Sequence, residues 1–310
     1  MNGASFTWIA NPDTGRLDSW PIEFGRPAWI GALNSDGTYC ATGLWPYDAG
    51  GILASVGTAI TGIDGGGVRF LPDPVTSTCK GQNTRGGAIG QWNGQAYFRE
   101  IDGGILRFDF FQRPLPRDDF VPVQLSSINE RSEIVGYLQT GQFWGRGNPA
   151  ALWWSEDGGA VLLDNDVRPA VANDIDNAGR IVGAGVNSNS DFVPMLWLDW
   201  QARGVELPLP SGFATGEALA ISDDGFVVGQ GLDSRRERAG LVWFGGRVFL
   251  ADALIASPVE ARDGGWHVSA IVDANGNSRM LGEVAERVDA GGVSAIIYHP
   301  VVMDLVGSCL

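Results

Sequence analysis

A strand–turn–strand unit recurs along this chain and limits its fold more than any other feature of the sequence. The unit is clearest at residues 218–229, Ala-Leu-Ala-Ile-Ser-Asp-Asp-Gly-Phe-Val-Val-Gly. Small and apolar residues precede a cluster of turn formers, and aromatic and β-branched residues typical of strands follow it. Equivalent residues of successive copies are separated by 46 to 51 residues. These equivalent residues are Leu33, Gln82, Ile128, Ile175, Ile221 and Val272.

Each unit continues with a second half. In the clearest copy, residues 239–243 predict a third strand that ends in Trp243, and residues 247–250 predict a fourth. The aromatic residue at the end of the third strand is expected to pack between repeats. Hydrophobic residues alternate and show no helical period. A repeat of about 47 residues with four short strands is typical of a propeller blade, so the sequence predicts an all-β protein, a β-propeller of four-stranded blades.

The repeats predict one β-propeller domain over residues 1–310. Full repeats begin at about residues 28, 77, 123, 170, 217 and 266, whereas residues 1–22 match only the second half of the unit. Six blades with an extra hairpin are favoured. The alternative is seven blades, one of them assembled from both ends of the chain, which would remove free sheet edges.

The repeat also resembles a known family. Its pattern Ala-x-x-Ile-Asn-x-x-Gly-x-Val-Val-Gly, followed by Ala-x-Leu-Trp, looks like the bacterial HAF repeat and, more distantly, like kelch blades. The resemblance covers most of residues 1–305 and implies an extracellular, periplasmic or cell-envelope propeller, although residues 1–20 show no signal peptide. The signature positions of the family are structural, so the resemblance transfers no catalytic residue.

Composition narrows the choice of partners. The net charge of −15 and the pI near 4.4 argue against nucleic acid, because binding of phosphate requires a basic surface. No apolar run is long enough to cross a membrane, so membrane insertion is not expected. The three cysteines have no CxxC spacing, which argues against a zinc site. A bridge between Cys40 and Cys79, which lie in neighbouring repeats, stays open.

The loops between the second and third strands hold the candidate ligand-binding residues. Aromatic rings interleaved with amides and charged groups suit a sugar, because its apolar ring faces stack on aromatic rings and its hydroxyls need donors and acceptors. Trp45, Trp92 and Trp144 are the favoured cluster, and ordinary solvated loops are the competing interpretation. The full set is Trp45, Tyr47, Trp92, Tyr137, Gln142, Trp144, Arg146, Asn187, Asn189, Arg235 and Arg236.

Catalytic candidates are few. Paired carboxylates can hydrolyse glycosides, but the pairs at 174/176 and 223/224 recur in repeat turns and are assigned to turn chemistry. The remaining candidates are Asp118, Asp119, Asp191, Asp233 and His267. With two histidines in the chain a multi-histidine metal site is excluded, and His299 is assigned to the scaffold. No cofactor is predicted. Fragments of a calcium loop at 34–37 and 273–277 are a minority interpretation.

The favoured function is a non-enzymatic extracellular propeller that binds a glycan or a protein through its loop-rich face. The first alternative is a carbohydrate-active hydrolase or lyase that uses loop carboxylates. The second is a structural subunit of a surface assembly, in which blade edges and the acidic exterior make the contacts. The sequence leaves the oligomeric state open.

Overall fold

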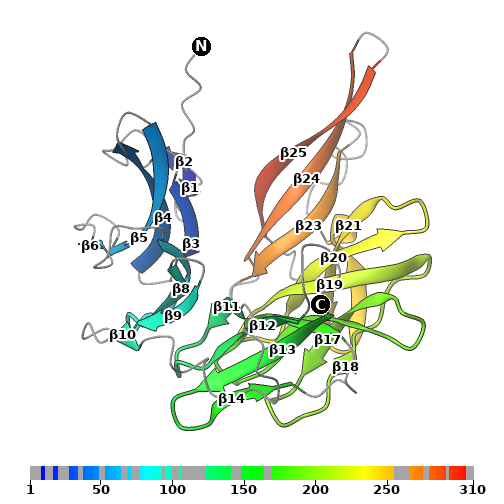
Figure 1. The fold of residues 1–310 in the computed structure, drawn as a ribbon. Helices are drawn as coiled ribbons and strands as arrows, with labels where there is room; N and C mark the ends of the chain where they lie inside the picture. The colour runs from blue at the N-terminus through cyan, green and yellow to red at the C-terminus, as the bar shows by residue number, and fades with distance from the viewer. Residues whose placement is uncertain are drawn as a thin grey trace. The chain divides into compact units, whose positions relative to one another are not determined.

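The computed structural model of the chain is built almost entirely of β-strands (Figure 1). Among the described residues the helical element is one turn of 3-10 helix, η2 (Ala251–Ala253), and no helix is long and apolar enough to cross a membrane. The structure describes residues 8–10, 17–19, 28–33, 38–48, 53–63, 69–70, 77–92, 95–99, 105–106, 123–140, 148–163, 169–254, 266–274, 279–290 and 293–304.

Five four-stranded antiparallel sheets follow one another along the chain, and we call them blades 1 to 5. Blade 1 is β3 (Ala28–Leu33), β4 (Thr38–Asp48), β5 (Leu53–Ile63) and β6 (Arg69–Phe70), and blade 2 is β7 (Ser77–Gln82), β8 (Ala88–Trp92), β9 (Gln95–Arg99) and β10 (Ile105–Leu106). Blade 3 is β11 (Val123–Ile128), β12 (Ile134–Thr140), β13 (Asn148–Ser155) and β14 (Gly159–Leu162). Blade 4 is β15 (Ala170–Ile175), β16 (Ile181–Val186), β17 (Phe192–Trp197) and β18 (Val205–Glu206), and blade 5 is β19 (Phe213–Ile221), β20 (Val227–Asp233), β21 (Arg238–Phe244) and β22 (Arg247–Leu250).

Two smaller sheets lie at the ends of the chain. The hairpin of β1 (Trp8–Ala10) and β2 (Leu17–Ser19) is the predicted N-terminal half unit. The last sheet, blade 6, has three strands: β23 (Trp266–Ala274), β24 (Arg279–Ala290) and β25 (Val293–Asp304). The chain divides into two compact units, residues 1–142 with 154–160 and residues 143–153 with 161–310.

The predicted fold class is confirmed. In each four-stranded blade the strands pair in chain order, and each predicted repeat start falls at or close to the first strand of a blade. The predicted fourth strand at residues 247–250 matches β22. This meander of four antiparallel strands is the blade of β-propellers. The single domain and the choice between six and seven blades stay predictions.

A glycine near the start of the second strand has a steric cause. The first strand carries a β-bulge, and in blade 5 the register shifts between Ala218 and Ala220. A Cβ added at Gly229, which pairs with Ala218, would overlap the carbonyl oxygen of Glu217. The same overlap would occur at the equivalent glycines of blades 2, 3 and 4: Gly90, Gly136 and Gly183. The Val-Val-Gly signature therefore ends in glycine because two backbones approach closely at that position.

One predicted equivalence is wrong. The sequence aligns Val272 with Ile221, which lies opposite Val227 at the end of the first hairpin of blade 5. In blade 6 the corresponding pair, two residues before the glycine of the second strand, is Ala274 with Met280. A register shift between Ile271 and Asp273 leaves Val272 unpaired and exposed. The bulge displaces the register, which spacing along the sequence does not reveal.

The apolar core of blades 4 and 5 lies between them. Val182 of blade 4 packs with Ala218, Leu241 and Trp243 of blade 5. Trp243 is buried, and its indole N–H donates a 2.6 Å hydrogen bond to the Pro208 carbonyl oxygen. The predicted packing of a strand-three aromatic between repeats is confirmed for this residue. A second core cluster joins blades 5 and 6 and includes Val228, Val242, Val268 and Ile271.

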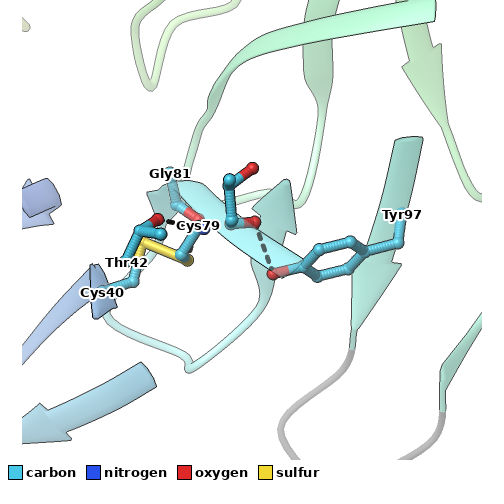
Figure 2. Close-up of a disulfide and its surroundings, with 6 residues drawn as sticks. Cys40, Thr42, Cys79, Gly81 and Tyr97 are labelled. Atoms are coloured by element: carbon cyan, nitrogen blue, oxygen red, sulfur yellow. Dashed lines mark hydrogen bonds between the residues drawn. A yellow bond between two sulfur atoms is a disulfide. The ribbon is translucent and has the colours of Figure 1, made fainter. Parts of the chain in front are cut away.

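A disulfide joins blades 1 and 2 (Figure 2). Cys40 of β4 and Cys79 of β7 are both buried, their Cα atoms are 5.7 Å apart, and the bridge that the sequence left open is present. The Cys79 N–H donates to Thr42 Oγ1 at 3.1 Å, so the two strands are also hydrogen-bonded at this point. The Tyr97 hydroxyl donates to the Thr78 carbonyl at 3.1 Å, and burial raises the pKa of this phenol.

Candidate functional site

Two hairpin turns between the second and third strands carry several of the predicted site residues. The turn of blade 4 spans residues 187–191 and that of blade 5 spans 233–237, and in both the first N–H bonds the fifth carbonyl. Asn187 Oδ1 accepts the N–H groups of Asn189 and Asp191 at 2.9 and 3.0 Å. Asp233 Oδ1 accepts those of Arg235 and Glu237 at 2.8 and 2.9 Å. Asn187 and Asp233 thus stabilise their own turns.

The turns between the first and second strands have the same geometry. In blade 3 Asn129 Oδ1 accepts the N–H groups of Arg131 and Glu133, both at 3.0 Å. In blade 4 Asp176 Oδ1 accepts the Arg180 N–H at 2.8 Å. The carboxylate of Asp223 accepts two hydrogen bonds from Asn177, from its N–H at 2.9 Å and its side-chain amide at 2.8 Å. The assignment to turn chemistry is confirmed for Asp176, whereas Asp223 links its turn to that of the neighbouring blade.

The structure places four predicted loop aromatics in strands, three inside a strand and one at a strand end. Trp45 and Tyr47 lie inside β4, opposite Val56 and Ala54 of β5, and Tyr137 lies inside β12 opposite Gln124. Their prediction as loop residues is wrong, because aromatic residues favour strands and these hairpins continue past the expected strand ends. Trp92 is the last residue of β8 and pairs with Gln95. Asp118, Asp119, Gln142, Trp144 and Arg146 lie outside the described residues, and so does most of both predicted calcium loops.

Blade 6 brings together an aromatic ring, an imidazole and a carboxylate from three adjacent strands. Trp266 begins β23 and pairs with Glu286 of β24, while His299 of β25 pairs with Val284. The Trp266 and His299 rings stack with centroids 4.8 Å apart and an interplanar angle of 21°. His299 Nε2 lies 3.0 Å from Glu286 Oε2. Because an ionised carboxylate only accepts, His299 Nε2–H is the donor. We call these three residues the Trp266 site.

The pleat of the sheet explains why these side chains meet. Val268 lies two residues after Trp266, and Val284 lies two residues before Glu286, so each pair shares a face of the sheet. Val268 belongs to the core between blades 5 and 6, and Val284 packs against it. The Trp266 site therefore lies on the same face of the sheet as this core, at the place where that face reaches solvent. The His299 and Glu286 side chains are 38% and 26% exposed, so a ligand can reach both.

The predicted residues of the blade 5 turn lie beside the same hairpin. Glu237 Oε1 lies 3.7 Å from Arg287 Nη2, which links the turn that carries Arg235 and Arg236 to β24. Both side chains of this ion pair are largely exposed, so it contributes little to stability. It shows that the arginine-rich turn and the residue after Glu286 are neighbours. The junction of blades 5 and 6 thus combines aromatic, acidic and basic groups.

Sequence reasoning missed the Trp266 site. The predicted histidine, His267, pairs with Ala285 one position further along β23, and the pleat directs it to the opposite face from Trp266. The histidine that joins the site is His299, which the sequence assigns to the scaffold. The doublets Trp266-His267 and Tyr298-His299 were a usable signal, since both histidines of the chain follow an aromatic residue in blade 6.

Metal binding receives no support from the described residues. Across the described ranges no three His, Cys, Asp or Glu side chains gather as a metal site would need. Glu286 and His299 are two ligands at most, and a zinc site requires three or four. The groups of the Trp266 site suit hydrogen bonding and stacking instead.

Comparison with known proteins shows distant structural likeness. No family model and no curated protein matches the chain. TolB from Acinetobacter baumannii has 12% identity and a TM-score of 0.48, over 88% of this chain and 67% of that one. A mutant of AofleA from Arthrobotrys oligospora has 10% identity and a TM-score of 0.43, over 93% of each chain. Trypanosoma rangeli sialidase, solved with sialic acid, has 10% identity and a TM-score of 0.40, over 98% of this chain and 57% of that one.

Proposed function

We propose that this protein is a non-enzymatic module of propeller-type blades that binds a glycan at the junction of blades 5 and 6. The Trp266 site carries the proposal. The indole and imidazole rings stack on each other, and the outer face of this pair is the surface on which the apolar face of a sugar ring would stack. The Glu286 carboxylate accepts hydrogen bonds from hydroxyl groups of the sugar.

A location outside the cytoplasm belongs to the same proposal. The Cys40–Cys79 disulfide supports it, because such bonds form and persist in oxidising compartments such as the periplasm and the cell exterior. Glycans of the cell surface and of the surroundings are available there.

Binding is preferred to hydrolysis because of the groups at the site. Glycoside hydrolysis needs two carboxyl groups that flank the bond to be cleaved, about 5 to 9.5 Å apart. The Trp266 site, as the described residues form it, has the single carboxylate Glu286. A site with one carboxylate and a stacked ring pair holds a sugar without cleaving it.

A glycan array followed by calorimetry with the best hit tests the proposal. Trp266→Ala and His299→Ala should each weaken binding at least tenfold, which corresponds to about 1.4 kcal/mol. The matched control is His267→Ala, because His267 is also half-buried in blade 6 but faces the other side of the sheet. An array without hits, equal losses for both histidine variants, or release of reducing sugar would contradict the proposal.

A further inference from the structure

Among the described strands, the last strand of blade 6 has an open edge. β25 is outermost in the order β23-β24-β25, and among the described strands it pairs only with β24. Blades 1 to 5 each end in a short fourth strand of two to four residues. The β24–β25 hairpin also continues beyond β23, because Trp266 is opposite Glu286 and pairing persists to Ala290 and Val293 (Figure 1). A long open edge offers a row of backbone donors and acceptors to another strand.

This strand is apolar on both faces. Ile296, Ile297 and Tyr298 are 51%, 44% and 49% exposed. Successive side chains of a strand point to opposite faces, so a strand added beside β25 would cover apolar groups above and below the sheet. A two-stranded ribbon is marginally stable in water, and the described residues of the hairpin past β23 form such a ribbon. An added strand would stabilise it.

The charge of β25 indicates which kind of strand would pair with its edge. Residues 293–303 contain no Asp, Glu, Lys or Arg, in a chain whose net charge is −15. A charged peptide would find no complementary group on this strand. Two copies of an acidic chain repel each other across most of their surfaces, but an uncharged strand lets them approach without placing like charges side by side. The uncharged sequence of β25 therefore favours the same strand of a second copy as its partner.

We propose that β25 pairs antiparallel with β25 of a second copy, which gives a twofold-symmetric dimer with a sheet continuous across both chains. Proline has no N–H, so Pro300 ends the uninterrupted run of donors. The pairing segment is Val293 to His299, about 23 Å long at ~3.3 Å per residue. Its central residue, Ile296, lies opposite Ile296 of the second copy. The dimer does not depend on glycan binding.

Crosslinking tests the register. Directly opposite residues of antiparallel strands have Cβ atoms about 4.5–5.5 Å apart, close to the range that a disulfide spans. In a Cys309→Ser background, Ile296→Cys should give a covalent dimer on a non-reducing gel. The matched control is Val302→Cys, which is exposed to a similar degree, at 48%, but lies beyond Pro300. Equal crosslinking of both variants, or none with Ile296→Cys, would overturn the proposal.

Sedimentation velocity tests the dimer itself. The wild-type protein should show a dimer whose fraction rises with concentration, and Ile296→Lys should weaken dimerisation at least tenfold. Leu198→Lys, at an apolar residue that is 61% exposed and lies outside blade 6, should dimerise like the wild type. Circular dichroism confirms that each variant is folded. A wild-type monomer at every concentration, or a dimer that Ile296→Lys leaves intact, would exclude pairing through β25.

Discussion

Adjacent blades are joined in two different ways in this protein. Blades 1 and 2 share the covalent bond between Cys40 and Cys79. Blades 4 and 5 are joined by hydrogen bonds between backbone and side chains. Asp174 Oδ2 accepts the Ile221 N–H at 2.8 Å, and Asn173 Nδ2 donates to the Ala218 carbonyl at 2.9 Å. The first junction thus has a covalent bond in addition to its hydrogen bond, whereas the second is held by an apolar core and several hydrogen bonds.

The difference shows that a disulfide adds to the contacts of a repeat without replacing them. In blades 2 to 5 the turn between the first and second strands has the same geometry. Polar turn residues link neighbouring blades, because the Thr84 N–H donates to Glu130 at 2.9 Å and the Asn177 N–H donates to Asp223 at 2.9 Å. The blade 2 copy of the repeat has Gln82 at the usual apolar position, and Cys79 connects this blade to blade 1. A disulfide stabilises mainly by restricting the unfolded chain, so its effect adds to that of these hydrogen bonds.

The largest expected effect follows from breaking the covalent junction. The double variant Cys40→Ser, Cys79→Ser should lower the free energy of unfolding by about 4 kcal/mol, because the bond spans a sequence separation of 39 residues. Urea denaturation measures the loss. Cys309→Ser is the control and should change stability by less than about 0.5 kcal/mol. Equal losses in the two proteins would show that the bridge does not hold the junction.

An intermediate effect is expected at the hydrogen-bonded junction. Asp174→Ala should lower the free energy of unfolding by about 2 kcal/mol, because it removes the acceptor of the Ile221 N–H. Asp224→Ala, at an exposed residue in the turn of the next blade, should cost less than about 0.5 kcal/mol. The same denaturation experiment measures both. A loss at Asp174 as large as that of the disulfide would contradict a junction shared among several bonds.

The smallest effect is expected in the turn between the second and third strands. The fourth residue of each five-residue turn in blades 4 and 5 has a positive φ. In the turn between the first and second strands this residue is a glycine, Gly179 or Gly225. In the turn between the second and third strands it is Ser190 or Arg236. Arg236→Gly should raise the free energy of unfolding by about 1 kcal/mol, since an L-residue is strained there. Thermal melting measures the gain. The control Arg235→Gly, at a residue without positive φ, should instead lose stability.

Most of the fold could be predicted from the sequence. The spacing of the strand–turn–strand units indicated the blades, and residues 247–250 form a strand as expected. Turn residues such as Asp176 were assigned correctly, because an Asx side chain bonds backbone groups of its own turn, which is a local property. The position of Val272 was predicted wrongly, because a β-bulge changes the register without changing the spacing.

The candidate site could not be predicted in the same way. Trp266, Glu286 and His299 are separated by 13 to 20 residues along the chain and come together only when three strands pair in register. The choice between His267 and His299 depends on which face of a strand each occupies, and that depends on the register of β24 with β23 and with β25. Trp45 and Tyr47 were assigned to a loop because the length of β4 is set by its pairing with β5.

The sequence by itself determined the blade: its strands, its turns and the glycine beneath the bulge follow from local sterics and from hydrogen bonds within a few residues. Only the tertiary structure decided which cysteines are joined, which histidine contacts a carboxylate and which of the described strands keeps an open edge. Each of these depends on pairing between residues far apart in the chain, where register and pleat, rather than residue type, determine the neighbours.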